Sequence, residues 1–192
     1  MSTKNKKNGE PYRVIEDFFS YAALDRHRKY IFSMLKAAYC EDYWRKSDPG
    51  SLLFFQEQME KLMKATYLLT AKKNKTVKKK EAKLKNEVLG MVIDPATYVG
   101  RLNGDAMWEC FPRVLSRKEF INPYLAIEKF FTYKNLNEWL AHFKELIYYA
   151  LSPYGNESAL DIDYLKANNL LQKLIEASHL IHVRVNKPGL RF

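Results

Sequence analysis

The chain has 192 residues and 47% of them are apolar, so it is long enough to bury a substantial core. Seven Gly and seven Pro give few turn signals for a many-stranded sheet, and two isolated cysteines, Cys40 and Cys110, argue against a disulfide-stabilised scaffold. The net charge of +10 suggests an anionic partner, but most of this charge lies in one short segment described below.

The sequence carries no signal for membrane insertion or secretion. No stretch approaches 18 uninterrupted apolar residues, and residues 1–10 are polar and lysine-rich rather than apolar. Two isolated cysteines are typical of a reducing compartment. We therefore expect a cytoplasmic protein that makes no membrane contact.

An internal repeat is the strongest pattern in the sequence. Residues 11–24 read PYRVIEDFFSYAAL and residues 123–136 read PYLAIEKFFTYKNL, with eight of fourteen positions identical. The offset that aligns position 11 with position 123 also pairs Met34 with Leu146 and Leu62 with Leu174. The sequence therefore predicts two copies of one unit, residues 11–73 and residues 123–185.

Each copy is predicted to contain three helices. The first opens at the proline at position 11 or 123, with Asn122 as a cap in the second copy, and ends near position 21 or 133. The second begins just after Asp25 or Asn137 and carries its apolar residues on one face. The third follows a turn at residues 47–50 or 152–155 and is capped by Ser51 or Asp163.

The two copies are expected to form one domain. A unit of three short helices exposes too much apolar surface to be stable alone. The pattern therefore predicts an all-α fold in which residues 1–192 form a single helical domain. In this bundle the two repeats pack about a pseudo-two-fold axis and are joined by a basic, partly irregular insert.

The insert, residues 74–122, has a mixed pattern. Residues 75–88 are predicted to be helical, with Gly90 as the stop, and residues 91–111 are compatible with coil, a short helix or a small hairpin. Ser116 and Glu119 form the pattern of a capping box, which predicts a short helix before the second copy.

The positive charge is concentrated at residues 72–85. This tract has one acid, Glu81, and eight lysines: Lys72, Lys73, Lys75, Lys78, Lys79, Lys80, Lys83 and Lys85. Such a tract can follow a phosphate backbone, but it lacks interleaved aromatic residues that would stack on bases. A solvated helix or a connection between the copies explains the same lysines.

An acidic residue recurs inside the apolar segment of both copies, as Glu16 and Glu128. The functional interpretation is a paired polar site near the pseudo-axis. The structural interpretation, which we prefer, is an acid in the first helix that interacts with the helix dipole or with a basic side chain. No histidine or second acid recurs beside them to complete a catalytic set.

Glu176, His179 and His182 resemble a fragment of a helical metal site. The equivalent positions of the first copy hold Lys64, Tyr67 and Thr70, so the repeat does not supply a second ligand set. Both histidines lie near the predicted end of a helix, where imidazoles commonly cap the helix or face solvent. The sequence therefore predicts no metal and no cofactor.

The functional prediction rests mainly on what the sequence lacks. It contains no phosphate-binding glycine loop, no nucleophile motif and no catalytic constellation, while its many aromatic residues are more typical of a core than of a ligand pocket. We therefore expect a non-enzymatic binding or adaptor protein with a protein partner, acting through a helical face or the groove between the repeats. The alternative is a nucleic-acid-associated protein that uses residues 72–85.

A run in the second copy adds a resemblance. Leu115 and Ser116, residues 122–124, residues 130–131, Leu136 and Trp139 together resemble uncharacterised bacterial helical proteins. This resemblance implies no activity and no site residues.

Overall fold

The computed structural model describes residues 4–40, 44–71, 110–152 and 162–185. In this part of the chain all regular elements are helices: α1 (Lys4–Tyr21), α2 (Leu24–Tyr39), α3 (Pro49–Ala71), α5 (Arg117–Ile121), α6 (Tyr124–Tyr133), α7 (Leu136–Leu151) and α8 (Tyr164–Val185). The predicted all-α class is therefore confirmed for these residues. The predicted helix at 75–88 and residues 91–109 of the undecided segment 91–111 lie outside them.

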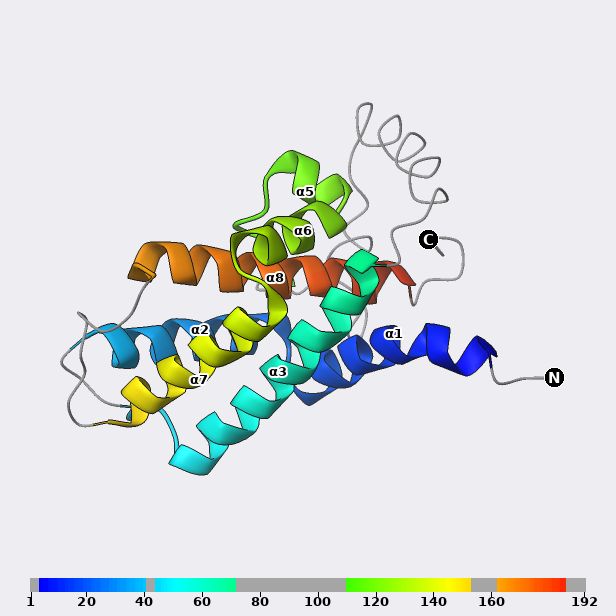
Figure 1. Cartoon of the computed structure of the whole chain (residues 1–192). Helices are drawn as coiled ribbons and strands as arrows, with labels where there is room; N and C mark the ends of the chain where they lie inside the picture. The colour runs from blue at the N-terminus through cyan, green and yellow to red at the C-terminus, as the bar shows by residue number, and fades with distance from the viewer. Residues whose placement is uncertain (1–3, 41–43, 72–109, 153–161, 186–192) are drawn as a thin grey trace.

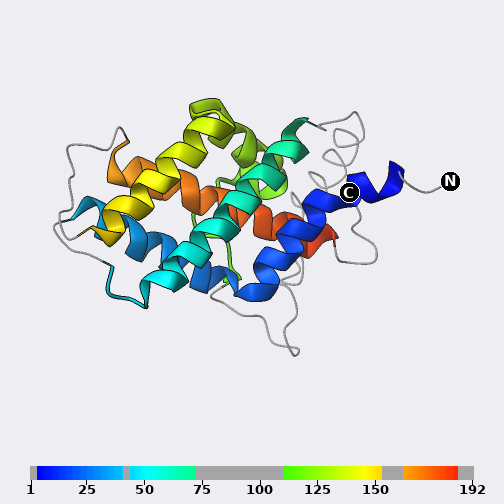
Figure 2. The ribbon, with the colours of Figure 1, turned by 60° about the horizontal axis from the view of Figure 1, so that its bottom comes forward.

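Four of the helices pack as two crossed pairs. α3 and α7 lie side by side in one layer, and α2 and α8 lie side by side in the other (Figure 1). Contacts between α2 and α7 join the layers, while α1 and α6 each pack against both α3 and α8. Figure 2 shows the same crossing from a second direction. Helices from the two ends of the chain therefore share one bundle.

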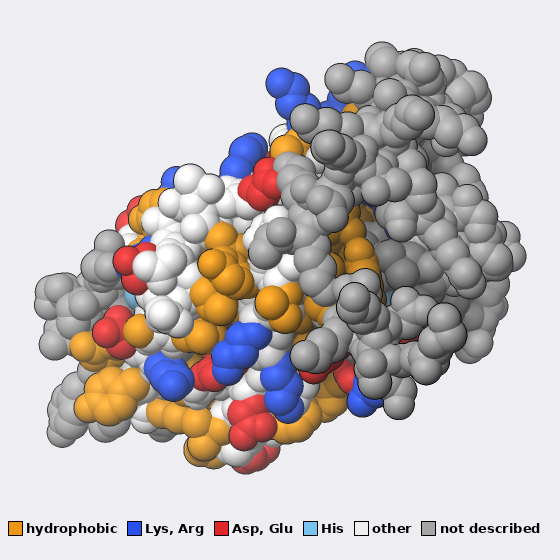
Figure 3. Space-filling view, turned by 45° about the vertical axis from the view of Figure 1, so that its right-hand side comes forward, with side chains coloured by type: hydrophobic (Ala, Val, Ile, Leu, Met, Phe, Trp, Pro, Cys, Tyr) orange, Lys and Arg blue, Asp and Glu red, His pale blue; other side chains and the backbone are white. Residues whose placement is uncertain are grey.

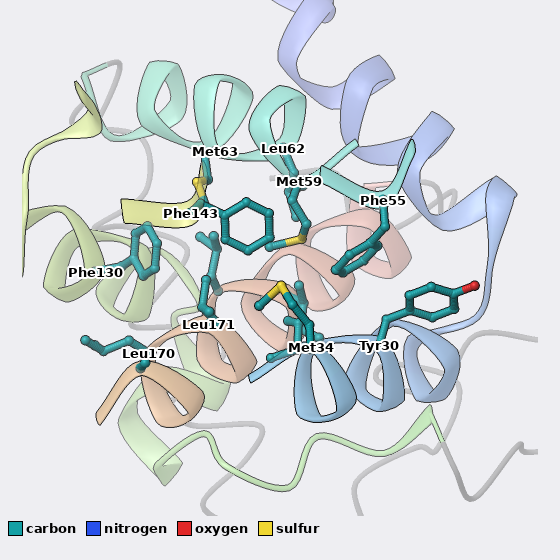
Figure 4. Close-up of a cluster of buried hydrophobic side chains, with 14 of the residues drawn as sticks. Tyr30, Met34, Phe55, Met59, Leu62, Met63, Phe130, Phe143, Leu170 and Leu171 are labelled. Atoms are coloured by element: carbon teal, nitrogen blue, oxygen red, sulfur yellow. The ribbon is translucent and has the colours of Figure 1, made fainter. Parts of the chain in front are cut away.

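The core lies between these layers. Met34 from α2, Phe55 and Met59 from α3, Phe143 from α7 and Leu171 from α8 meet there and are at most 1% exposed (Figure 4). Burial of a side chain of this size contributes about 1.5–3 kcal/mol to folding. Because the core draws on both predicted copies, neither copy encloses it alone.

Side-chain caps begin several of the helices as predicted. Ser116 and Glu119 form the capping box of α5, and Asn122 Oδ1 accepts a hydrogen bond of 3.1 Å from the Tyr124 N–H at the start of α6. Asp163 Oδ1 accepts from the Lys166 N–H at 2.9 Å and caps α8. These short polar residues satisfy N–H groups that have no partner within the helix.

The predicted starts of α1 and α3 were wrong by a few residues. α1 begins at Lys4, so Pro11 lies inside this helix, because the polar residues before it continue the helical turn. The cap of α3 is Asp48, which accepts the Ser51 N–H at 2.9 Å, rather than Ser51 itself.

The predicted starts of α2 and α7 were also displaced. α2 begins at Leu24, before Asp25 rather than after it. α7 is capped by Asn135 rather than by Asn137, because the Asn135 side chain accepts the Glu138 N–H and the Glu138 side chain accepts the Asn135 N–H.

A pair of local interactions recurs at equivalent positions of the two predicted copies. His27 stacks on Phe18 with ring centroids 4.0 Å apart, and its Nε2 donates a hydrogen bond of 3.0 Å to the Phe18 carbonyl. Trp139 stacks on Phe130 at 4.1 Å, and its Nε1 donates to the Phe130 carbonyl at 2.8 Å. Each ring therefore ties the start of the second helix of its unit to the end of the first.

Candidate binding groove

A buried ion pair joins α2 to α8. Arg28 Nε donates to Glu176 Oε1 at 3.0 Å, and the Arg28 Nη2 atom makes a second contact with the same oxygen. The two side chains are only 8% and 0% exposed. Burial of an unpaired charge is costly, and here each buried charge compensates the other.

Glu176 also holds the segment that precedes α5. Its two carboxylate oxygens accept the backbone N–H groups of Arg113 at 2.8 Å, Val114 at 3.0 Å and Leu115 at 3.3 Å. Arg28 Nη2 donates to the Phe111 carbonyl at 2.5 Å. One buried ion pair therefore fixes residues 111–115 against the surface formed by α2 and α8.

A second buried carboxylate fixes the next part of the same segment. Glu119 is fully buried and accepts hydrogen bonds of 2.8 Å from both Lys129 and Lys173, and of 2.9 Å from the Ser116 N–H. Burial alone raises the pKa of a carboxyl group, but these hydrogen bonds outweigh it and lower the pKa of Glu119 to about 2. α5 is thereby attached to α6 and α8.

A groove of about 380 Å³ opens where α2, α8 and this segment meet. Polar, charged and apolar side chains line it together: Asp25, Arg28, Lys29, Phe32, Ser33, Lys46, Arg113, Val114, Asn168, Gln172 and Glu176. Gln172 Nε2 donates to the Arg28 carbonyl at 3.2 Å and so connects the floor to α2. The groove thus has a hydrogen-bonded floor, and its described lining comes from four separate parts of the chain: α2, Lys46, residues 113–114 and α8.

The charges of the lining are partly compensated. Glu176 pairs with Arg28, and Lys29 Nζ lies 2.7 Å from Asp25 Oδ2. In the described part of the chain no ion pair includes the other two lining cations, Lys46 and Arg113. The groove therefore carries two excess positive charges at its rim.

Lys46 is held in an environment that disfavours its charge. Its Nζ lies 4.8 Å above the ring of Tyr30, which provides a favourable cation–π contact. Partial burial and then the nearby cations Lys29 and Arg26 lower the pKa of Lys46 from its ordinary value. An anion placed in the groove would relieve this repulsion.

One face of the molecule is of mixed character among the residues described. On the face shown in Figure 3, described hydrophobic side chains are interspersed with Lys, Arg, Asp and Glu side chains. This face therefore carries neither a single sign of charge nor one continuous apolar area among the residues described.

The structure places the recurring acids away from the groove. Glu16 lies on α1 and is exposed, whereas Glu128 lies on α6 and is half-buried. Their backbone carbonyls accept equivalent hydrogen bonds of 2.8 Å from Ser20 Oγ and Thr132 Oγ1. The other predicted contact residues, the eight lysines at 72–85, lie outside the described residues.

The histidine pair of α8 packs against an aromatic ring. His179 is 6% exposed, so the expectation that it caps the helix or faces solvent was wrong, because Phe19 of α1 packs on it with ring centroids 5.1 Å apart. His182 lies 5.6 Å from the same ring. Glu176, the potential third ligand, is engaged by Arg28. Among the described residues no cluster of three or more potential metal ligands occurs.

Sequence reasoning missed the residues that build the groove. Arg28 lies beside the apolar stripe predicted for the second helix, and Glu176 was considered only as part of the histidine motif. One signal was present: the equivalent positions of the other copy hold Leu140 and Lys64, so neither charge recurs there. A difference between copies, rather than a similarity, distinguishes the site.

Comparison with known proteins gives no relative from which a role can be transferred: no family model, curated protein or solved structure matches this chain. Within the described residues, no helix is long and apolar enough to cross a membrane.

Proposed function

We propose that this protein is a non-enzymatic binding protein that recognises a protein partner through the groove between α2, α8 and residues 110–116. The observation that carries this proposal is the combination of a hydrogen-bonded floor, built on the Arg28–Glu176 pair, with an accessible rim that bears two excess cations. Binding sites commonly combine an apolar surface with a few fixed polar groups.

The proposal includes an internally duplicated scaffold with a pseudo-two-fold axis. Three observations support it. α2 and α7 begin at positions that the repeat makes equivalent, and both contain 16 residues. The stacking and hydrogen bonding of His27 match those of Trp139. The hydroxyl groups of Tyr12 and Tyr124, a further equivalent pair, lie 3.4 Å from each other, as expected for a residue and its copy close to an axis.

The helix contacts support the same arrangement. If α1, α2 and α3 correspond to α6, α7 and α8, then the packing of α2 on α8 corresponds to that of α7 on α3. The packing of α1 on α3 and α8 likewise corresponds to that of α6 on α8 and α3. The groove then lies between the second helix of one copy and the third helix of the other.

The chemistry of the lining favours binding over catalysis. No histidine or cysteine is among the described residues that line the groove. The two carboxylates of the described lining are already engaged: Glu176 pairs with Arg28 and accepts backbone N–H groups, and Asp25 pairs with Lys29. Neither is therefore placed to take a proton from a substrate. The side chains at the rim instead offer positive charge and the half-exposed ring of Phe32.

The test of a binding role uses the full chain and a matched pair of variants. A random peptide library displayed on phage is selected against the immobilised protein, and the enriched peptides are measured by fluorescence anisotropy. Phe32→Ala removes a groove side chain that is 52% exposed. The control is Lys144→Ala, which removes an exposed side chain of α7 at the position that the proposed repeat makes equivalent to Phe32. We expect only Phe32→Ala to weaken binding. Peptides that bind both variants equally well would contradict a role for the groove.

Nucleic-acid binding through residues 72–85 is the second candidate. It is favoured by one observation, the presence of eight lysines and a single acid within this tract. Lysines in this density release counterions when they neutralise phosphates, which makes the affinity strongly salt-dependent.

A further inference from the structure

We infer that the occupant of the groove is an acidic segment of a partner protein that also carries an apolar side chain. This inference rests on the proposed function and specifies its partner. In this arrangement carboxylates of the segment contact Lys46 and Arg113, and its apolar side chain packs on Phe32 and Val114.

The net positive charge of the groove favours an acidic ligand. Of the four cations among its described lining residues, Arg28 and Lys29 are neutralised by Glu176 and Asp25, as the ion pairs show. Lys46 and Arg113 come from different parts of the chain, yet both line this groove. Two uncompensated cations across one groove match two carboxylates better than a single one.

The volume of the groove and the apolar side chains of its walls favour a short segment with an apolar residue. The ring of Phe32 is 52% exposed although it lines the groove, and Val114 is partly exposed beside the Glu176 carboxylate. A volume of about 380 Å³ holds a few side chains rather than a folded element. A short extended segment with mixed acidic and apolar residues therefore matches both the unpaired cations and the exposed apolar side chains of the lining.

The same features disfavour a nucleic acid in this groove. A phosphate backbone requires a row of unpaired cations, whereas only Lys46 and Arg113 among the described lining cations lack an ion-pair partner. Phe32 is the only aromatic side chain among the described residues of the lining, so successive bases have no stacking platform. The observations therefore favour an acidic peptide over a polynucleotide.

The test determines the composition of the peptides that the protein selects, and whether their binding depends on Lys46 and Arg113. The full chain is used to select from a random peptide library, and the composition of the enriched peptides is compared with that of the library. Binding of synthetic versions is then measured at low and high salt for the wild type and for the double variant Lys46→Gln/Arg113→Gln. The control, Lys61→Gln/Lys144→Gln, removes two exposed lysines from α3 and α7.

We expect enriched peptides that are rich in Asp and Glu and contain an apolar residue. The rim variant should weaken their binding about tenfold at low salt and less at high salt, because screening already reduces the contribution of exposed charges. The control should bind as the wild type does. Binding of single-stranded DNA that the rim variant abolishes, without enrichment of acidic peptides, would assign the groove to a polynucleotide and overturn the inference.

Two further outcomes separate this inference from the proposed function. Neutral peptides that lose binding in Phe32→Ala but not in the rim variant would leave the groove as a binding site and refute its preference for acidic segments. Peptides that bind all variants equally, or the absence of any enriched peptide, would refute the groove itself. Circular dichroism of each variant establishes that the helical fold is retained.

Discussion

The Arg28–Glu176 pair offers the sharpest test of how the groove is built. In Glu176→Gln the side chain keeps its shape but loses its charge, so Arg28 becomes an uncompensated buried cation. In the wild type the backbone N–H groups of residues 113–115 donate to the Glu176 carboxylate. The amide of the variant places an NH₂ donor against these N–H groups. Removal of one partner of a buried pair costs about 3–5 kcal/mol, a large part of the total stability of a typical domain.

Arg28→Leu should be less damaging than Glu176→Gln. After this substitution the Glu176 carboxylate still accepts three backbone N–H groups, which stabilise its charge. Leucine also occupies the equivalent position of the proposed second copy, at Leu140, which is half-buried. The cost should therefore be about 1–3 kcal/mol, comparable to the loss of hydrogen bonds to a charged group.

Urea and thermal unfolding of both variants, followed by far-ultraviolet circular dichroism at pH 7, measure these costs. For a chain of this length each kcal/mol lowers the Tm by about 2–4 °C, so Glu176→Gln should lower it by about 6–20 °C. A Glu176→Gln protein within about 1 kcal/mol of the wild type would show that this ion pair does not hold residues 111–115 in place. An Arg28→Leu protein less stable than the Glu176→Gln protein would show that the three backbone N–H groups do not stabilise the Glu176 charge as argued.

Three further predictions concern the scaffold and the lysine tract. Burial lowers the pKa of His27 to about 4, below its ordinary value near 6.5, so stability should be complete above pH 6.5 and fall by about 3 kcal/mol as the pH drops to 4. His27→Phe should reduce the loss of unfolding free energy between pH 6.5 and pH 4. Trp139→His should increase this loss if the two sites are equivalent. Asn135→Ala should cost about 1 kcal/mol in urea unfolding because it removes the α7 cap, whereas Asn137→Ala should cost almost nothing. Replacement of the lysines at 72–85 by glutamine should weaken any binding of single-stranded DNA and reduce its salt dependence in titrations at two salt concentrations; unchanged affinity would remove this tract as a nucleic-acid site.

The helices themselves were largely predictable from the sequence. The apolar spacing of residues 27–38 predicted the buried face of α2, and Ile31, Met34 and Leu35 are fully buried there. Helix starts were less predictable because several cap-type residues stand close together. Near α7, for example, both Asn135 and Asn137 have suitable side chains, and only the geometry of the reciprocal bond with Glu138 selects Asn135.

The groove was not predictable from local patterns. Arg28 and Glu176 are 148 residues apart in sequence, and a contact over that distance leaves no periodic signal in either helix. Helical periodicity treats a charged residue beside an apolar stripe as solvent-exposed, yet Arg28 is buried because the segment 110–116 covers it. Only the packing of three separate elements creates the polar interior that these residues share.

The differences between the proposed copies indicate how many ligands one chain binds. Packing constrains core positions to keep an apolar side chain, as Met34 and Leu146 illustrate, since both are fully buried. The positions equivalent to Arg28 and Glu176 hold Leu140 and Lys64, which cannot form the same ion pair or accept the backbone N–H groups of a covering segment. If the scaffold is duplicated, its groove is not, so the proposed mode of binding provides one site per chain and a partner should bind with a stoichiometry of one to one.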